Sequence, residues 1–313
     1  MKKRAIVLSI LTLIIIGLGS IIINIPSGKN GQIFIPVELP QLIVNHNVPD
    51  TISFAGEPVP LDNIFVMEAL DKELQINSYW HSSSIQLLKR ANRWFPVIEP
   101  ILKKNGIPND FKYLSLIESG LENVVSPRGA AGFWQLMKAT AQEYGLEINK
   151  DVDERYDVEK ATEVACKYLN KAYAKFGNWT LAAASYNAGM RRISEEYSEQ
   201  KASSYYDMYL NTETGRYIYR ILAVKKIFES PFSFGFHISE NELYPPLKYK
   251  KIEVSHSISS LAAFAKKHDI SYNELKTFNP WLKNKKLRNS KKKKYFIKVP
   301  DTNFRKRIPH SIK

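Results

Sequence analysis

The segment from Phe111 to Gln135, FKYLSLIESGLENVVSPRGAAGFWQ, is the part of the sequence that most restricts the fold. It begins with apolar residues at helical spacing, and Glu118 lies at the edge of that apolar stripe. A Gly/Ala-rich stretch that ends in an aromatic residue and an amide follows. The pattern predicts a helix that carries an acid near its end, followed by a tight loop.

Glu118 is the candidate for acid chemistry. A carboxyl group held against apolar neighbours resists ionisation, so we expect its pKa to rise toward the range of a general acid. Ser119 and Gly120 end the helix and would expose the side chain at a cleft. A plain surface glutamate is the alternative. Glu122, the nearest second carboxylate, shares a helix face with Glu118, so we assign it a surface role.

Length and charge point to two unequal domains. A chain of 313 residues predicts one large domain and a smaller one. Residues 246–313 carry 19 Lys and Arg against 4 Asp and Glu, whereas residues 1–245 carry 26 against 27. The basic C-terminal part, with a lysine run at 291–294, suggests attraction to a polyanion.

Metal and cofactor chemistry are not expected. The chain has one cysteine, Cys166, in an Ala-rich helical run, which favours a buried inert thiol over a nucleophile. The six histidines show no HxxH or HExxH spacing. We therefore predict no disulfide, no metal site and no cofactor.

The N-terminal part predicts export. Basic residues precede an uncharged run from Ala5 to Ile25, long enough to span a bilayer, and an uncleaved anchor is favoured over a cleaved signal peptide. Residues 26–61 follow as a proline-containing tether. Residues 62–104 are predicted to be helices that pack on the main domain, broken or restarted at Pro96 and Pro100.

Four motifs carry a resemblance to a known family. The motifs are Glu118-Ser119, Gly132-Phe133-Trp134-Gln135, Ser185-Tyr186-Asn187-Ala188-Gly189 and Tyr217. Their order and spacing over about residues 90–235 resemble soluble-lytic-transglycosylase-type (SLT) domains of glycoside hydrolase family 23, and the GFWQ variant is similar to the membrane-bound lytic transglycosylase D subgroup. These domains share the fold of goose-type lysozyme.

The resemblance implies a reaction and a substrate. It implies cleavage of the β-1,4 bond between N-acetylmuramic acid and N-acetylglucosamine in peptidoglycan without water, leaving a 1,6-anhydro ring. Glu118 would be the catalytic acid and then the base. The substrate-binding residues would be Gly132, Trp134, Gln135, Tyr186, Asn187 and Tyr217, together with Ser119, whose hydroxyl could instead bond to the backbone. Glu213, in the turn before Tyr217, is assigned a surface role.

A second resemblance lies near the end. Strands at 251–254 and 295–299 enclose two helices, 258–268 and 272–278, in the βααβ order of a LysM module, which binds N-acetylglucosamine chains. Ser255-His256-Ser257 replaces the usual Gly-Asp-Thr, so we regard the module as degenerate.

These interpretations give a mainly α fold: a lysozyme-like (goose-type) helical catalytic domain plus a small βααβ LysM-like domain. The expected partners are peptidoglycan glycan strands and, through the N-terminal span, a membrane; nucleic acid is not expected. The expected location is the cell envelope, with the catalytic domain in the periplasm or otherwise outside the cytoplasmic membrane. A muramidase hydrolase and a non-catalytic wall-binding protein are the alternatives.

The expected segments are 1–25 (signal-anchor), 26–61 (tether), 62–104 (packing helices), 105–236 (catalytic), 237–247 (linker), 248–301 (LysM-like) and 302–313 (basic tail).

Overall fold

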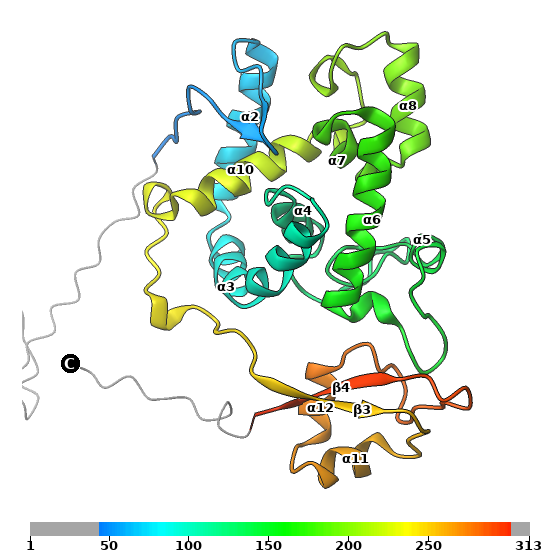
Figure 1. Cartoon of the computed structure of the whole chain (residues 1–313). Helices are drawn as coiled ribbons and strands as arrows, with labels where there is room; N and C mark the ends of the chain where they lie inside the picture. Colours follow the sequence, from blue (N-terminus) through cyan, green and yellow to red (C-terminus); the bar gives the residue numbers. More distant parts are fainter. Residues whose placement is uncertain (1–43, 302–313) are drawn as a thin grey trace, which may run out of the picture. The chain divides into compact units, whose positions relative to one another are not determined.

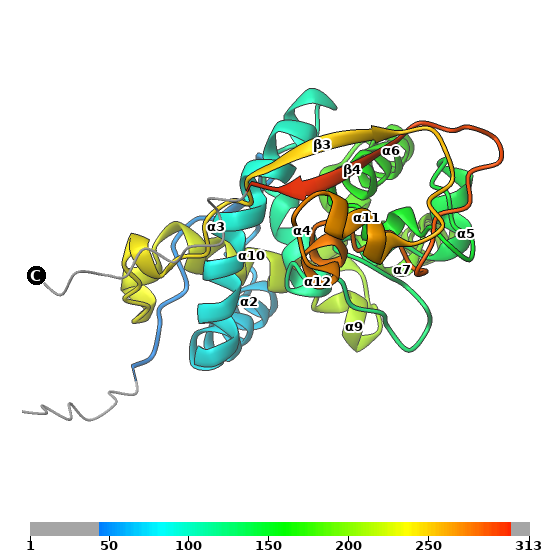
Figure 2. The same ribbon diagram turned by 90° about the horizontal axis from the view of Figure 1, so that it is seen from below.

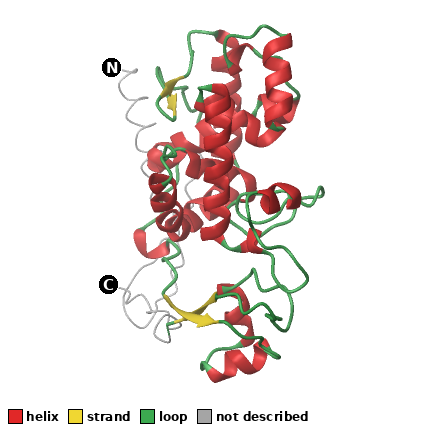
Figure 3. Ribbon diagram, turned by 45° about the vertical axis from the view of Figure 1, so that its right-hand side comes forward, coloured by secondary structure: helices red, strands yellow, loops and turns green. Residues whose placement is uncertain are grey.

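The structure, a computed structural model, describes residues 44–301 of the chain (Figure 1). Helices make up most of this part, as predicted, and the strands form two small sheets (Figure 3). The predicted membrane span, the first half of the predicted tether and the whole basic tail lie outside the described residues. Within residues 44–301 no helix has the length and hydrophobicity needed to cross a membrane.

The helical domain is built around one short helix. Its α-helices in chain order are α2 (Ile64–Tyr79), α3 (His81–Lys104), α4 (Phe111–Ser119), α5 (Lys138–Glu143), α6 (Val158–Phe176), α7 (Trp179–Ala188), α8 (Met190–Glu199), α9 (Thr212–Gly215) and α10 (Tyr217–Glu229). Helix α4 lies among the others, in contact with α3 and α10 (Figure 1). Phe111, Leu114 and Leu116 of α4 are all buried in the core. Leu114 and Leu116 lie on nearly opposite sides of the helix, so α4 is enclosed by its neighbours on more than one side.

Helix α3 corrects one expectation. It runs unbroken through Pro96 and Pro100, where the sequence predicted a break or restart. A proline removes one backbone hydrogen bond from the preceding turn. Here both prolines lie on the exposed face, where water can solvate the released carbonyls, while Ile98 and Leu102 on the other face pack into the core. Burial of that face is enough to keep the helix continuous.

The end of the predicted tether is also part of the domain. Strands β1 (Ser53–Phe54) and β2 (Glu57–Pro58) form a hairpin, and Phe54 is buried against Phe111 with ring centroids 5.2 Å apart. The Glu57 carboxylate accepts hydrogen bonds from the N–H groups of Trp179 and Thr180 at the start of α7, at 2.5 and 2.9 Å. An anion is favourable at a helix N-terminus. The expectation of a free tether up to residue 61 is therefore wrong for this hairpin.

The C-terminal domain has the predicted βααβ order. Strands β3 (Tyr249–Val254) and β4 (Tyr295–Pro300) pair antiparallel, and α11 (Leu261–Lys267) and α12 (Tyr272–Phe278) lie against them (Figure 2). Apolar side chains at alternating strand positions and on the helices form its core, among them Leu261, Leu275 and Ile297. The chain reaches this domain along α3, where the carbonyls of Tyr244 and Pro245 accept hydrogen bonds from Asn92 and Arg93.

Candidate active site

Glu118 lies in the last turn of α4. Gly120 caps the helix in the left-handed conformation, with φ 62°, so the predicted helix end is confirmed. The hydroxyl of Tyr217, the first residue of α10, donates a hydrogen bond to Oε1 of Glu118. Tyr217 itself is 2% exposed. These two motif residues, 99 positions apart in the chain, thus lie in direct contact.

The surroundings of Glu118 raise its pKa to about 6. Burial is the main cause, because a carboxylate loses hydration among apolar groups, and the negative charge of Glu213 acts in the same direction. The Tyr217 hydrogen bond and the positive charge of Arg220 oppose the rise. The carboxyl group is therefore protonated in a substantial fraction of molecules near pH 6, as a general acid requires.

Ser119 joins the helix end to the following loop. Its hydroxyl is within hydrogen-bonding distance of the carbonyls of Phe133, at 2.9 Å, and Ser115, at 3.2 Å. It also accepts from the N–H of Leu121 at 3.1 Å. The geometry corresponds to the backbone-bonded alternative, in which Ser119 keeps the loop that contains Phe133 beside Glu118.

The loop of residues 124–136, here called the motif loop, is tightly folded. Gly132 has φ 77°, and a Cβ atom there would lie 2.0 Å from the carbonyl oxygen of Arg155. The close approach that requires glycine is thus to the chain's own backbone. Gln135 donates its side-chain amide to the carbonyls of Val124 and Gly132, at 3.1 and 2.8 Å, so this amide also holds the loop closed.

Trp134 does not have the predicted position. It is 0% exposed, and its indole N–H donates to the Thr162 hydroxyl at 2.8 Å. The expected substrate-binding role does not fit this position, because the ring is enclosed in the core beneath the motif loop, which its apolar surface stabilises. The Tyr186 hydroxyl donates to the Trp134 carbonyl at 2.7 Å, which ties α7 to the same loop.

Asn187 and Glu213 form a polar edge beside Glu118. The Asn187 side-chain oxygen accepts a hydrogen bond from the Thr214 hydroxyl at 2.9 Å. Its side-chain nitrogen donates to Oε1 of Glu213 at 3.4 Å. Glu213 is exposed, yet its charge acts on Glu118. Sequence reasoning placed Glu213 on the surface and missed this electrostatic link. Its position four residues before the motif tyrosine was the one available signal.

A cavity of about 650 Å³ lies between the helical and C-terminal domains. Asn123 and Phe133 are among its lining residues, but Glu118 is not. Within residues 44–301 no group of three or more His, Cys, Asp or Glu side chains could hold a metal ion. Cys166 is buried, and burial raises the pKa of its thiol to about 12, which makes it a poor nucleophile.

Comparison with known proteins identifies two domains. Residues 95–209 match the transglycosylase SLT domain, and residues 250–303 match the soluble lytic transglycosylase C-terminal LysM-like domain. Membrane-bound lytic murein transglycosylase D of Escherichia coli (strain K12) is 27% identical over 247 residues, which cover 76% of this chain and 53% of that protein. The chain thus spans about half the length of this curated relative.

Two solved structures are also similar. Lytic transglycosylase Slt of Pseudomonas aeruginosa, as an inactive mutant, has a TM-score of 0.38 and 21% identity over 48% of this chain and 26% of its own. The 70 kDa soluble lytic transglycosylase of Escherichia coli has a TM-score of 0.39 and 18% identity, over 56% of this chain and 33% of its own. On the sequence matches, residues 95–209 belong to the transglycosylase SLT family and residues 250–303 to the LysM-like domains that accompany it.

Proposed function

We propose that this protein is an exported, membrane-anchored peptidoglycan lytic transglycosylase that cleaves the β-1,4 bond between N-acetylmuramic acid and N-acetylglucosamine. The observation that carries the proposal is Glu118, whose partly buried carboxyl group has a pKa of about 6 and accepts a hydrogen bond from Tyr217. The SLT match and the name of the Escherichia coli relative support the same substrate.

The proposed mechanism uses Glu118 twice. Protonated Glu118 gives its proton to the glycosidic oxygen as the bond from C1 to that oxygen breaks. The resulting carboxylate then takes the proton of the muramoyl C6 hydroxyl as O6 bonds to C1, which closes the 1,6-anhydro ring and restores the acid. The nucleophile belongs to the substrate, so the protein needs to supply position and electrostatic stabilisation.

Asn187, Gln135 and Tyr186 are the remaining candidates for binding the sugar chain at this site. Asn187 is partly exposed at the polar edge, whereas Gln135 and Tyr186 also hold the motif loop. We propose that Asn187 contacts an acetamido or hydroxyl group directly, because its amide combines donor and acceptor atoms. Tyr217 would act on Glu118 rather than on the sugar.

A muramidase hydrolase is the second candidate, because Glu213 provides an exposed carboxylate close enough to influence Glu118. Such a group could orient water for attack at C1. Mass spectrometry of the products from purified peptidoglycan separates the two functions. We expect 1,6-anhydro ends from the wild type and none from Glu118→Gln; products with reducing ends only would reject the transglycosylase proposal in favour of the hydrolase.

A further inference from the structure

The LysM-like domain is joined to the helical domain through residues 147–157, here called the bridging segment, which connects α5 to α6. The carboxylate of Asp151 accepts four hydrogen bonds from the C-terminal domain. Two come from the Arg288 guanidinium, both at 2.7 Å, one from the Arg288 backbone N–H at 3.1 Å and one from the Asn284 amide at 2.7 Å. These hydrogen bonds hold the pKa of Asp151 well below its ordinary value, and those from the Arg288 guanidinium have the largest effect.

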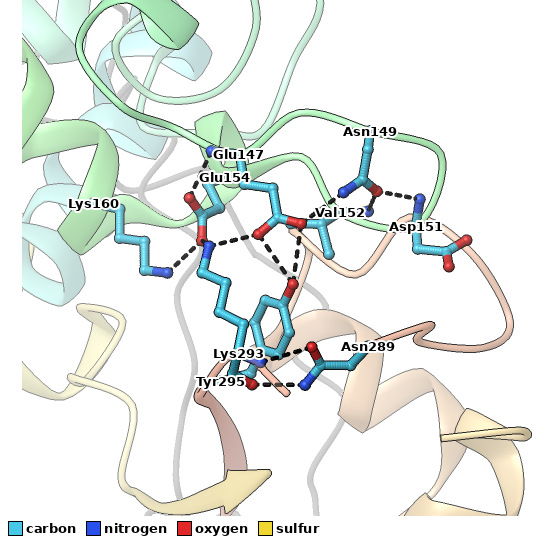
Figure 4. Close-up of polar contacts among 9 residues, drawn as sticks. All are labelled: Glu147, Asn149, Asp151, Val152, Glu154, Lys160, Asn289, Lys293 and Tyr295. Carbon is cyan, nitrogen blue, oxygen red and sulfur yellow. Dashed lines mark hydrogen bonds and ion pairs between the residues drawn. The ribbon is translucent and has the colours of Figure 1, made fainter. Parts of the chain in front are cut away.

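Figure 4 shows a second charged contact, which Lys293 and Tyr295 make with the bridging segment. The Lys293 ammonium donates to Glu147 at 2.5 Å and lies 3.6 Å from Glu154, while the Tyr295 hydroxyl donates to both oxygens of Glu147 at 3.0 Å. Burial alone would raise the pKa of Glu147, but the hydrogen bonds from Lys293 and Tyr295 outweigh it, so the pKa is lowered. Part of the basic lysine run is thus engaged within the protein.

Backbone contacts fix the alignment of the two domains. The N–H of Asp153 donates to the Trp281 carbonyl at 2.9 Å, and the N–H of Lys283 donates to the Asp151 carbonyl at 2.8 Å. Between them, Val152 and Leu282 form an antiparallel bridge. Backbone hydrogen bonds on both sides of one residue pair set one register. The bridging segment is therefore held in a defined place by the C-terminal domain.

The bridging segment in turn holds the motif loop. The Arg155 guanidinium is oriented by two hydrogen bonds to Asp153, at 3.0 and 2.8 Å, and donates to the carbonyls of Gly129 and Leu136, at 2.8 and 3.1 Å. The Arg155 carbonyl is the group that packs against Gly132. Arg155 thus contacts the motif loop at three positions, in its middle and at its C-terminal end.

The motif loop also reaches the C-terminal core directly. Ala131 is 0% exposed and belongs to the same apolar cluster as Leu282 and Tyr295 of the LysM-like domain, together with Val152 and Tyr156 of the bridging segment. An apolar cluster that two domains share is disrupted when one of them is removed.

We propose that the LysM-like domain positions the motif loop against Glu118, with Arg288 and Lys293 as positioning residues that act through the bridging segment. The domain is then a working part of the cleavage site in addition to any contact that it makes with the wall. This inference rests on the proposed function of Glu118. Glycan cleavage is sensitive to misplacement of the groups that bind the sugar, so loosening the loop should lower turnover.

The test is the double variant Arg288→Ala/Lys293→Ala, assayed on short soluble glycan strands prepared from peptidoglycan. Binding to an insoluble wall does not contribute to this assay, so a domain that only attaches the protein to the wall would leave it unchanged. We expect kcat to fall on the order of 10-fold with a smaller change in KM. Lys294→Ala is the matched control, since Lys294 pairs at 3.0 Å with Glu253 of its own domain. The single variant Arg288→Lys, in which Lys293 is unchanged, should keep most of the wild-type activity.

Amide hydrogen exchange of residues 124–136 gives a readout that does not depend on activity. Exchange should accelerate in the double variant, at a temperature where its circular dichroism matches the wild type, and should stay unchanged in Lys294→Ala. Unchanged kcat together with unchanged exchange would overturn the inference. If the wild type made no 1,6-anhydro product, the proposed function would fail, whereas the exchange comparison would still decide whether the domain holds the loop.

Discussion

Glu118 is subject to opposing influences that can be removed one at a time. Burial and Glu213 raise its pKa, whereas Tyr217 and Arg220 lower it. The protonated form is the one that starts the proposed reaction, so activity should decline as the pH rises past about 6. The position of this decline therefore reports the surroundings of one carboxyl group.

Two substitutions should move the decline in opposite directions. Tyr217→Phe removes a hydrogen bond to the carboxylate, so the pKa of Glu118 should rise and the alkaline limb should move to higher pH. Glu213→Gln removes a negative charge, so the limb should move to lower pH. The measurement is kcat/KM against pH on soluble glycan strands. Shifts of the same sign in both variants would contradict this account of the site.

The same carboxyl group predicts a stability effect. A carboxyl whose pKa is raised from 4.5 to about 6 in the folded state favours folding when protonated and opposes it when ionised. Glu118→Gln should therefore stabilise the protein above pH 6, by up to about 2 kcal/mol, and have little effect at pH 4. Urea unfolding at pH 8 and pH 4 measures the difference. An equal effect at both pH values would show that the gain comes from packing and not from ionisation.

For single residues, the sequence predicted which side chains belong to the site more reliably than it predicted the contacts that each of them makes. The resemblance assigned Tyr217 and Glu118 to one site, and the structure brings the two side chains into contact. The sequence could not reveal that Trp134 is buried and bonded to Thr162, since an aromatic residue suits both a sugar face and a core. The influence of Glu213 depends on a turn whose path the sequence does not define.

Among the elements, the motif loop offers a matched pair of glycines. Gly129 and Gly132 both have positive φ, 81° and 77°, but a Cβ meets nothing within 4 Å at Gly129 and lies 2.0 Å from a carbonyl oxygen at Gly132. Gly129→Ala should cost about 1 kcal/mol of folding free energy from backbone strain alone. Gly132→Ala should cost more and lower activity, because the loop must move away from Arg155. Comparable losses of melting temperature and activity in both variants would refute the role of this contact.

The elements also show where sequence patterns stop being informative. The βααβ order of the C-terminal domain was predicted because alternating and helical periods distinguish its strands from its helices. The continuity of α3 was not predicted. The low helix propensity of proline is a local property, whereas the burial of Ile98 and Leu102 is a property of the folded domain. The hairpin at Phe54 was missed because two-residue strands have no recognisable period.

Across the whole molecule, acidic residues of the helical domain face basic residues of the C-terminal domain. Besides the contacts of Asp151 and Glu147, Glu159 lies 3.0 Å from Lys251 and 3.4 Å from Lys298. The pKa of Glu159 is lowered: burial opposes this, but the charge of Lys298 and the hydrogen bonds from Lys251 and Tyr249 outweigh it. The junction therefore combines a shared apolar cluster with several carboxylates that are favoured in their charged form.

This arrangement predicts that the junction weakens in acid before either domain unfolds. A carboxylate with a lowered folded-state pKa stabilises the folded protein above its ordinary pKa, near 4, and loses that contribution as the pH falls further. Scanning calorimetry should show one cooperative transition at pH 7 and two separated transitions near pH 3. Asp151→Asn, which cannot ionise, should already show partial separation at pH 7 because the amide is a poorer partner for Arg288. A single transition at both pH values in the wild type would mean that the shared apolar cluster alone couples the domains.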